Sequence, residues 1–243
     1  MNCKPTLFAV YLFLLSLPLR AQYSIGLEGG LSLNSLNTNI SNRVSTRLAS
    51  DWGFNAALPL RYALAPWLYI KASPTLLKKD YSLYRTDSLY GAYERFNNTY
   101  IQLPIGISLA YGKKLQLLAD PGIYIGYWTG GRVKGKTPDI FNIRDTTDAS
   151  GQNLQSFQLS SFNDRYQFSS QRDNRWEWGW TLGLEAQYPL HDRWRLTAAG
   201  RYFQSLSSQQ KPATNPIPAY NQTWTFSLGL TRVHPPKKPS HEK

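Results

Sequence analysis

The three histidines are the side chains best suited to proton transfer near neutral pH. They are His191, His234 and His241. Hydrolytic catalysis would need one of them beside a serine or an acidic residue. His191 falls in a short predicted turn, and the other two lie at the C-terminal end, seven residues apart. We therefore expect no catalytic residue, no metal and no cofactor.

The single cysteine, Cys3, precedes a run of thirteen apolar-rich residues at positions 7–19. Lys4 before this run and Leu-Arg-Ala after it are typical of a secretory signal peptide, and the run is too short to cross a membrane as a helix. We predict a signal peptide at 1–21, with a retained N-terminal helix as the alternative. Without Cys3 the exported chain has no thiol chemistry and no disulfide.

The segments that carry most of the remaining charged side chains show a hydrophobic pattern that repeats every two residues. Segments 99–111 and 115–128 flank a tight turn at Gly112, and isoleucine and leucine alternate with small or polar residues. This period predicts strands. Each run exceeds the usual length of about 5–6 residues and suits a tilted strand that crosses a bilayer, which needs about 9–11. On its own, the pattern fits a soluble barrel with an apolar interior or a membrane barrel with an apolar exterior.

The same alternation recurs along the chain. The predicted strands are 22–35, 51–62, 67–79, 99–111, 115–128, 176–189, 194–206 and 221–233. Their connections are alternately long and short, which is typical of an outer-membrane barrel. We predict an all-β fold, an eight-stranded antiparallel up-and-down transmembrane β-barrel over 22–233. It has short periplasmic turns, long extracellular loops and a flexible periplasmic tail at 234–243.

The longest connection, 129–175, contains 47 residues. Its part 154–168 alternates weakly and predicts that the strands 115–128 and 176–189 extend beyond the bilayer as a hairpin. Another loop carries Tyr81, Tyr84, Tyr90, Tyr93 and Phe96, which would contact a partner or pack on one another. Within the strands, Pro104 and Pro121 each remove a ladder donor, which predicts a local bulge or a kink for partner docking.

The aromatic residues support the membrane alternative, because Trp and Tyr rings settle at both membrane interfaces. The predicted lower girdle comprises Tyr23, Tyr62, Trp67, Tyr111, Tyr188 and Trp194, and the upper girdle comprises Trp52, Tyr100, Tyr127, Trp176, Trp178, Tyr202 and Trp224. We therefore expect an integral protein of a Gram-negative outer membrane.

The opposite faces of the strands then point into the barrel. The predicted polar network of the lumen comprises Glu28, Asp51, Arg61, Lys71, Asp120, Glu177, Glu185, Arg195 and Arg201. The interior of an eight-stranded barrel is just wide enough for side chains to fill, and buried charges must be paired. We expect a paired network that closes the lumen, and neither a pore nor an apolar ligand cavity.

The chain has 27 Lys and Arg against 15 Asp and Glu, a net charge of +12. A net positive charge of this size is compatible with nucleic-acid binding, but we expect the chain to be exported, and its basic residues are scattered along the sequence. Several basic residues lie near predicted strand ends: Arg43, Arg47, Arg132, Lys134, Lys136, Arg172 and Arg175. Phosphate groups of outer-membrane lipid and lipopolysaccharide are the expected partners, and a solvated surface is the alternative.

Three stretches carry a family resemblance: YSIGLEGGLSLNSL, YIQLPIGISLAYGKKLQLLADPGIYIGYW and WGWTLGLEAQYPL. Together with the signal peptide they resemble the PorT-like outer-membrane β-barrel family of Bacteroidetes. The resemblance implies a role in type IX secretion, with other secretion-system subunits as partners, and it carries over no catalytic residue. The expected function is that of a non-catalytic accessory barrel for protein secretion. The alternative is a structural or adhesion barrel without a secretion role.

Overall fold

The computed structural model describes residues 22–40, 45–86, 90–147, 153–212 and 217–234, and for 140–147 and 153–157 it describes the backbone alone. The predicted signal peptide and all of the predicted tail except His234 lie outside the described residues.

The described chain forms one antiparallel sheet of twelve strands. They are β1 (Tyr23–Thr38), β2 (Thr46–Ala57), β3 (Leu60–Ala65), β4 (Leu68–Ala72), β5 (Thr75–Lys78), β6 (Tyr81–Arg85), β7 (Tyr93–Tyr111), β8 (Gln116–Thr147), β9 (Asn153–Arg165), β10 (Trp176–His191), β11 (Trp194–Ser205) and β12 (Ala219–His234). No helix in the described part of the chain is long and apolar enough to span a membrane.

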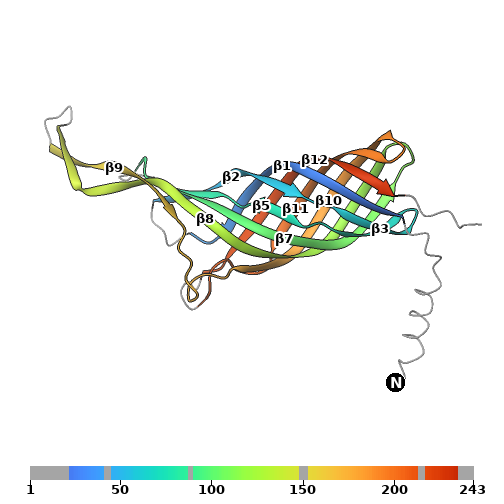
Figure 1. The fold of residues 1–243 in the computed structure, drawn as a ribbon. Helices are drawn as coiled ribbons and strands as arrows, with labels where there is room; N and C mark the ends of the chain where they lie inside the picture. Colours follow the sequence, from blue (N-terminus) through green and yellow to red (C-terminus); the bar gives the residue numbers. More distant parts are fainter. Residues whose placement is uncertain (1–21, 41–44, 87–89, 148–152, 213–216, 235–243) are drawn as a thin grey trace, which may run out of the picture.

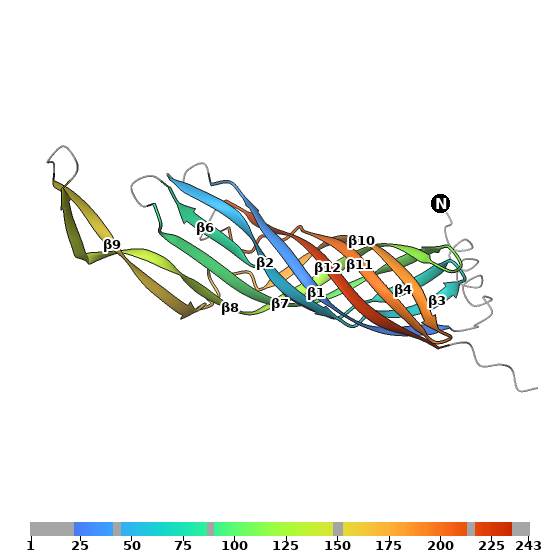
Figure 2. The same cartoon turned by 90° about the horizontal axis from the view of Figure 1, so that it is seen from above.

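The strand pairings close on themselves. From β1 they run through β12, β11, β10, β8, β7, β4 and β3, and β3 pairs with β1 again. Figures 1 and 2 show the resulting barrel, with the strands tilted to its long axis. Closure gives every strand of this ring two neighbours, so the ring has no free edge.

The structure has twelve strands where the alternation predicted eight, because two predicted strands are divided and two further strands, β6 and β9, lie in predicted loops. The predicted strand 51–62 is interrupted between β2 and β3 at Pro59, and the predicted strand 67–79 is interrupted between β4 and β5 at Pro74. Proline has no N–H to give to the ladder. The chain continues in the same direction after each break, and the Leu58 N–H donates to the Pro74 carbonyl across the two breaks at 2.9 Å.

Pro104 and Pro121 do not produce the predicted bulges. The Ser73 N–H donates to the Pro104 carbonyl at 3.0 Å, so Pro104 faces the break between β4 and β5, where the ladder is already interrupted. Near Pro121 the β7–β8 pairs pass from Gly106 and Gly122 to Leu109 and Ala119 without a change of register. The one register shift between β7 and β8 lies at Tyr100, where Thr129 is the extra residue.

The regions that were predicted as long loops contain further strands. The connection after 79 contains β6 and the beginning of β7. The connection after 128 contains the end of β8, which pairs with β9 from Arg132 to Thr147. The predicted strand 115–128 therefore extends into a hairpin, as expected, but its partner is the separate strand β9 rather than an extension of the predicted strand 176–189. The β8–β9 ribbon projects well beyond the rest of the barrel, at the end opposite the first residue of β1 (Figures 1 and 2).

The wall alternates as predicted, with apolar side chains outside and polar ones inside. Leu27, Ile123 and Leu184 are 67%, 70% and 69% exposed, whereas Ser32 and Thr223 are fully buried. This distribution is the reverse of that in a soluble protein. Among the described residues, Leu36, Tyr81 and Ala219 form a small buried apolar cluster beside the base of the ribbon.

The close approach of β7 and β8 depends on glycine. A Cβ at Gly106 would lie 2.2 Å from the Pro121 carbonyl oxygen, whereas a Cβ at Gly130 would have no heavy atom within 4 Å. We expect Gly106→Ala to lower the free energy of unfolding by about 1–3 kcal/mol, because the ladder must shift. Gly130→Ala is the matched control, and it should change stability by less than about 0.5 kcal/mol. Urea unfolding in micelles, followed by tryptophan fluorescence, measures both; equal effects would contradict the steric explanation.

Candidate functional site

Glu185 is the centre of the charge network inside the barrel. Its side chain is fully buried, and one oxygen, Oε2, accepts from three cations on three other strands. Arg61 on β3 forms the shortest of these ion pairs. Lys71 on β4 and Arg201 on β11 each lie 3.1 Å from the same oxygen. One carboxylate therefore links four strands across the lumen.

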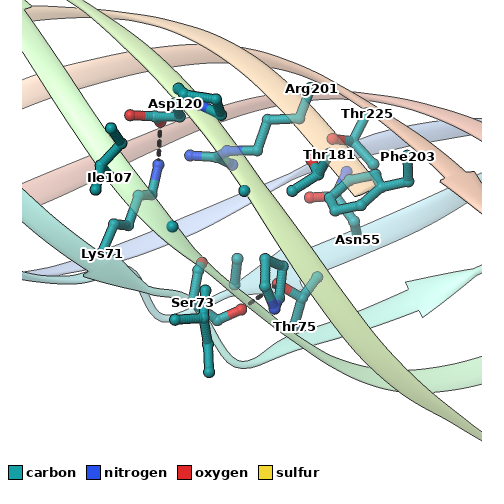
Figure 3. Close-up of a pocket in the computed structure, with 16 residues that line it drawn as sticks. Asn55, Lys71, Ser73, Thr75, Ile107, Asp120, Thr181, Arg201, Phe203 and Thr225 are labelled. Atoms are coloured by element: carbon teal, nitrogen blue, oxygen red, sulfur yellow. Dashed lines mark hydrogen bonds and ion pairs between the residues drawn. The ribbon is translucent and has the colours of Figure 1, made fainter. Parts of the chain in front are cut away.

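Two further carboxylates balance the three cations. Arg201 forms a two-pronged pair with Glu28, at 2.6 and 3.1 Å. Lys71 forms an ion pair with Asp120, which Figure 3 marks with a dashed line. The cluster thus contains three carboxylates and three cations, all buried. Buried ions are tolerated when they are paired with opposite charges in this way.

A small gap beside this cluster is the cavity drawn in Figure 3. Its volume is about 30 Å³, and its walls include Lys71, Ser73, Asp120, Arg201 and Phe203. A gap of this size holds about two water molecules. The lumen at this level is therefore filled by side chains and has no open channel.

A second buried ion pair, Lys79 with Glu177, lies on the side of the network towards the ribbon. The Lys79 ammonium is 4.9 Å from the ring centre of Tyr100 and 5.1 Å from that of Tyr124. Glu177 also accepts hydrogen bonds of 2.7 Å from the Tyr124 hydroxyl and from the Asn221 amide. Lys79 was absent from the predicted network because the predicted strand ended there. Extending the alternation of Lys71, Ser73 and Thr75 by two steps places it inside.

Asp51 and Arg195, which belong to the predicted network, lie nearer the two ends of the barrel and are partly exposed. Asp51 accepts from the Ser82 hydroxyl and lies 3.3 Å from the Arg95 guanidinium. Arg195 donates to the side-chain oxygens of Gln116 and Gln187. Neither residue contacts the central six charges.

The predicted girdle residues lie on the outer face, with one exception. Exposed are Tyr23, Trp67, Tyr111, Tyr188 and Trp194 towards the termini and Trp52, Trp176, Trp178 and Trp224 towards the ribbon. Tyr62, Tyr127 and Tyr202 are partly exposed. The prediction for Tyr100 was wrong, because this residue is 1% exposed and stacks inside on Trp128, with ring centres 5.8 Å apart. It shares the inward face of β7 with Gln102.

An aromatic cluster closes the barrel below the ribbon. Trp128 packs on Tyr166 and Phe168, at 4.8 and 4.9 Å between ring centres, and the Arg175 guanidinium lies 4.2 Å from the Phe168 ring centre. A cavity of about 500 Å³ lies above this cluster, and the stacked pair Tyr81 and Phe96 forms part of its wall.

Asp173 holds the segment between β9 and β10 in place. Its buried carboxylate accepts from the Tyr166 hydroxyl at 2.9 Å, the Ser169 N–H at 2.8 Å and the Arg172 guanidinium at 3.0 Å. Burial would raise the pKa of Asp173, but these hydrogen bonds outweigh it and lower the pKa below its ordinary value. Burial and the bond to Asp173 raise the pKa of Tyr166 to about 12.

Neither described histidine lies near the end of the barrel that carries the ribbon. His191 is exposed as the last residue of β10, and His234 stacks on Tyr23 at the same end of the barrel, with ring centres 4.3 Å apart. His241 lies outside the described residues. Among the described residues, no three His, Cys, Asp or Glu side chains gather in a way that would hold a metal ion.

Comparison with known proteins places the chain in one protein family. The sequence model of one protein family, described as "Outer membrane protein beta-barrel domain", matches residues 18–209. No curated protein matches the chain significantly.

Similar solved structures include three bacterial proteins. Ail of Yersinia pestis has 14% identity and a TM-score of 0.40, and the match covers 89% of this chain and 100% of Ail. OprG of Pseudomonas aeruginosa has 11% identity and a TM-score of 0.41, with coverage of 87% and 95%. The protease OmpT of Escherichia coli has 9% identity and a TM-score of 0.48, with coverage of 89% and 97%. Likeness at this level carries no functional information.

Replacing Glu185 tests the network. Glu185→Gln leaves Arg61, Lys71 and Arg201 with one carboxylate fewer, so we expect a loss of about 3–5 kcal/mol in the free energy of unfolding. Glu94→Gln is the control, since Glu94 is exposed and forms no ion pair among the described residues. Urea unfolding in micelles measures both variants. Equal stability of Glu185→Gln and the unchanged protein would show that the network is not needed.

Acidification tests the Asp173 contacts. Because the folded-state pKa is lowered, the stabilisation is complete above the unfolded value of about 3.9 and is lost as pH falls through the folded value. Carbon-13 NMR of the Asp173 carboxyl should give a midpoint below about 3.9. In Tyr166→Phe the midpoint should rise, because one hydrogen bond to the carboxylate is removed. A midpoint at or above the ordinary value would contradict the described contacts.

Proposed function

Because the chain belongs to the family of outer membrane protein β-barrel domains and is an integral protein of the outer membrane, we propose that it is a non-catalytic scaffold for protein secretion. The observation that carries this proposal is a contrast within one molecule. Its lumen is filled by paired charges, whereas its β8–β9 ribbon projects far beyond the barrel (Figure 1).

In this proposal the barrel crosses the membrane eight times. β2 and β3 together form one crossing, and β4, β5 and β6 form another, because each group follows one direction along a single neighbouring wall. β9 takes part in no crossing, since it pairs with the outer part of β8. The exposed aromatic residues near both ends of the wall would lie at the two membrane interfaces.

The filled lumen favours a scaffold over a channel. Glu185 and its three cations join opposite walls, and the gap beside them holds about two water molecules. Solutes therefore have no path through the barrel. The positions of His191 and His234 at the end with the chain termini also favour a non-catalytic role, because histidine is the side chain that most often performs general acid–base chemistry and neither lies at the outer mouth.

The ribbon favours contact with other proteins. Beyond Lys136, β8 pairs with β9 alone, so both outer edges of the ribbon are open. Such edges accept an added strand from a partner. The resemblance to the PorT-like family points to type IX secretion and to secretion-system subunits as these partners. A structural or adhesion barrel without a secretion role is the alternative.

The test uses a strain from which the gene has been deleted. It receives either the full chain or a chain in which 138–159 is replaced by a two-residue turn, since Thr137 and Ser160 are paired neighbours. We expect the full chain to restore delivery of secreted proteins to the cell surface. The shortened chain should insert normally and fail to restore it.

Two outcomes would contradict parts of the proposal. Normal secretion by the deletion strain with an intact envelope would remove the secretion role and leave the structural or adhesion barrel. Full restoration by the shortened chain would show that partners bind elsewhere than on the ribbon. The change in gel mobility of the barrel on boiling serves as the folding control for both chains.

A further inference from the structure

One face of the sheet formed by β7, β8 and β9 at the base of the ribbon carries a concentration of positive charge. Directly paired residues of an antiparallel sheet point to the same side, as do alternate residues of one strand. By this rule one face carries Tyr93, Arg95, Asn97, Arg132, Lys134, Lys136, Ser161, Asn163 and Arg165. We call it the basic face, since it holds five basic residues and no acidic one.

The basic face points away from the barrel interior. Glu94 and Phe96 belong to the opposite face of β7, and both line the cavity at the mouth. Along the basic face, Arg95 and Asn97 share their side of β7 with Ile101, which is 55% exposed on the outer wall. The basic face therefore continues the lipid-facing surface towards the outside of the cell.

The bulge at Thr129 makes the basic residues of β8 point to the same side as Arg95 on β7. Between the turn at Gly112 and the bulge, the odd-numbered residues of β8, such as Ile125, point outward. Between the bulge and the ribbon, the even-numbered residues point outward. The change occurs because Tyr100 pairs with Trp128, whereas the preceding residue, Thr99, pairs with Gly130. The Thr129 hydroxyl donates to the Thr99 carbonyl at 3.0 Å. Without this one-residue shift, Arg132 and its basic neighbours on β8 would point into the mouth.

The charges of the basic face repel one another. Arg132 pairs directly with Arg165, and Lys134 pairs directly with Arg95. Like charges opposite each other destabilise a sheet. Within the described chain, Arg95 contacts Asp51, whereas the other four basic residues are exposed and form no ion pair. An anion from outside the chain would relieve this repulsion.

We propose that the basic face binds the phosphate groups of the phosphorylated glycolipid in the outer leaflet. Arg132 lies four pairs beyond Tyr127 and Lys136 lies eight. With a rise of about 3.3 Å per residue and a tilt of about 40°, the face lies on the order of 10–20 Å above the upper aromatic residues. The phosphates of such a lipid are carried on sugars just above the hydrocarbon, towards which the long Lys and Arg side chains of the basic face extend. The site does not depend on a role in secretion.

The test measures binding of fluorescent lipid A to the purified full chain in nonionic detergent. Probes are lipid A with its phosphates, dephosphorylated lipid A, and inorganic phosphate as a competitor at constant ionic strength. The double variant Lys134→Glu with Lys136→Glu reverses two charges of the basic face. Lys113→Glu with Lys114→Glu makes the same charge change in the exposed turn at the other end of the barrel.

We expect the intact chain to prefer phosphorylated lipid A, and the basic-face variant to bind it roughly tenfold or more weakly. The turn variant should bind within about twofold of the intact chain, since local charge decides the attraction. Complete displacement by millimolar inorganic phosphate would show a site for free phosphate and overturn the proposal. No preference for phosphorylated lipid A, or equal losses in both variants, would also overturn it, and an acidic protein would then be the remaining occupant.

Discussion

The hydrogen-bonding demand of the backbone in a membrane is the constraint on which this structure depends. No water is present in the hydrocarbon to satisfy N–H and C=O groups, so a sheet that crosses it must close on itself. The pairing of β1 with both β12 and β3 meets this demand. In the closed barrel the apolar side chains point outward, and the polar side chains of all strands share a narrow interior.

The narrow interior explains the charge network. Each inward charge must find a partner from another strand, and Glu185 meets this requirement by joining Arg61, Lys71 and Arg201. Where the ion pairs end, large aromatic residues such as Trp128 fill the remaining space. The same packing that stabilises the barrel leaves no open channel at the level of Glu185.

The side of the wall on which most residues lie could be predicted from the sequence, because the period of two is local. Glu28 and Glu185 are inside and Leu184 is outside, as the alternation indicates. Bulges and breaks could not be predicted, because they depend on the neighbouring strand. Pro74 interrupts its strand and Pro104 does not, since Pro104 faces an existing gap. Ion-pair partners such as Asp120 for Lys71 required the folded arrangement.

The continuity of β8 has a mechanical consequence. Its 32 residues run without a break from the turn near the termini to the tip of the ribbon. A pull on the ribbon along this strand would act on the β7 and β10 ladders in shear, with many hydrogen bonds sharing the force at once. A sideways pull would instead separate β9 from β8 one pair at a time. The ribbon therefore resists a force along the barrel axis more strongly than a force across it.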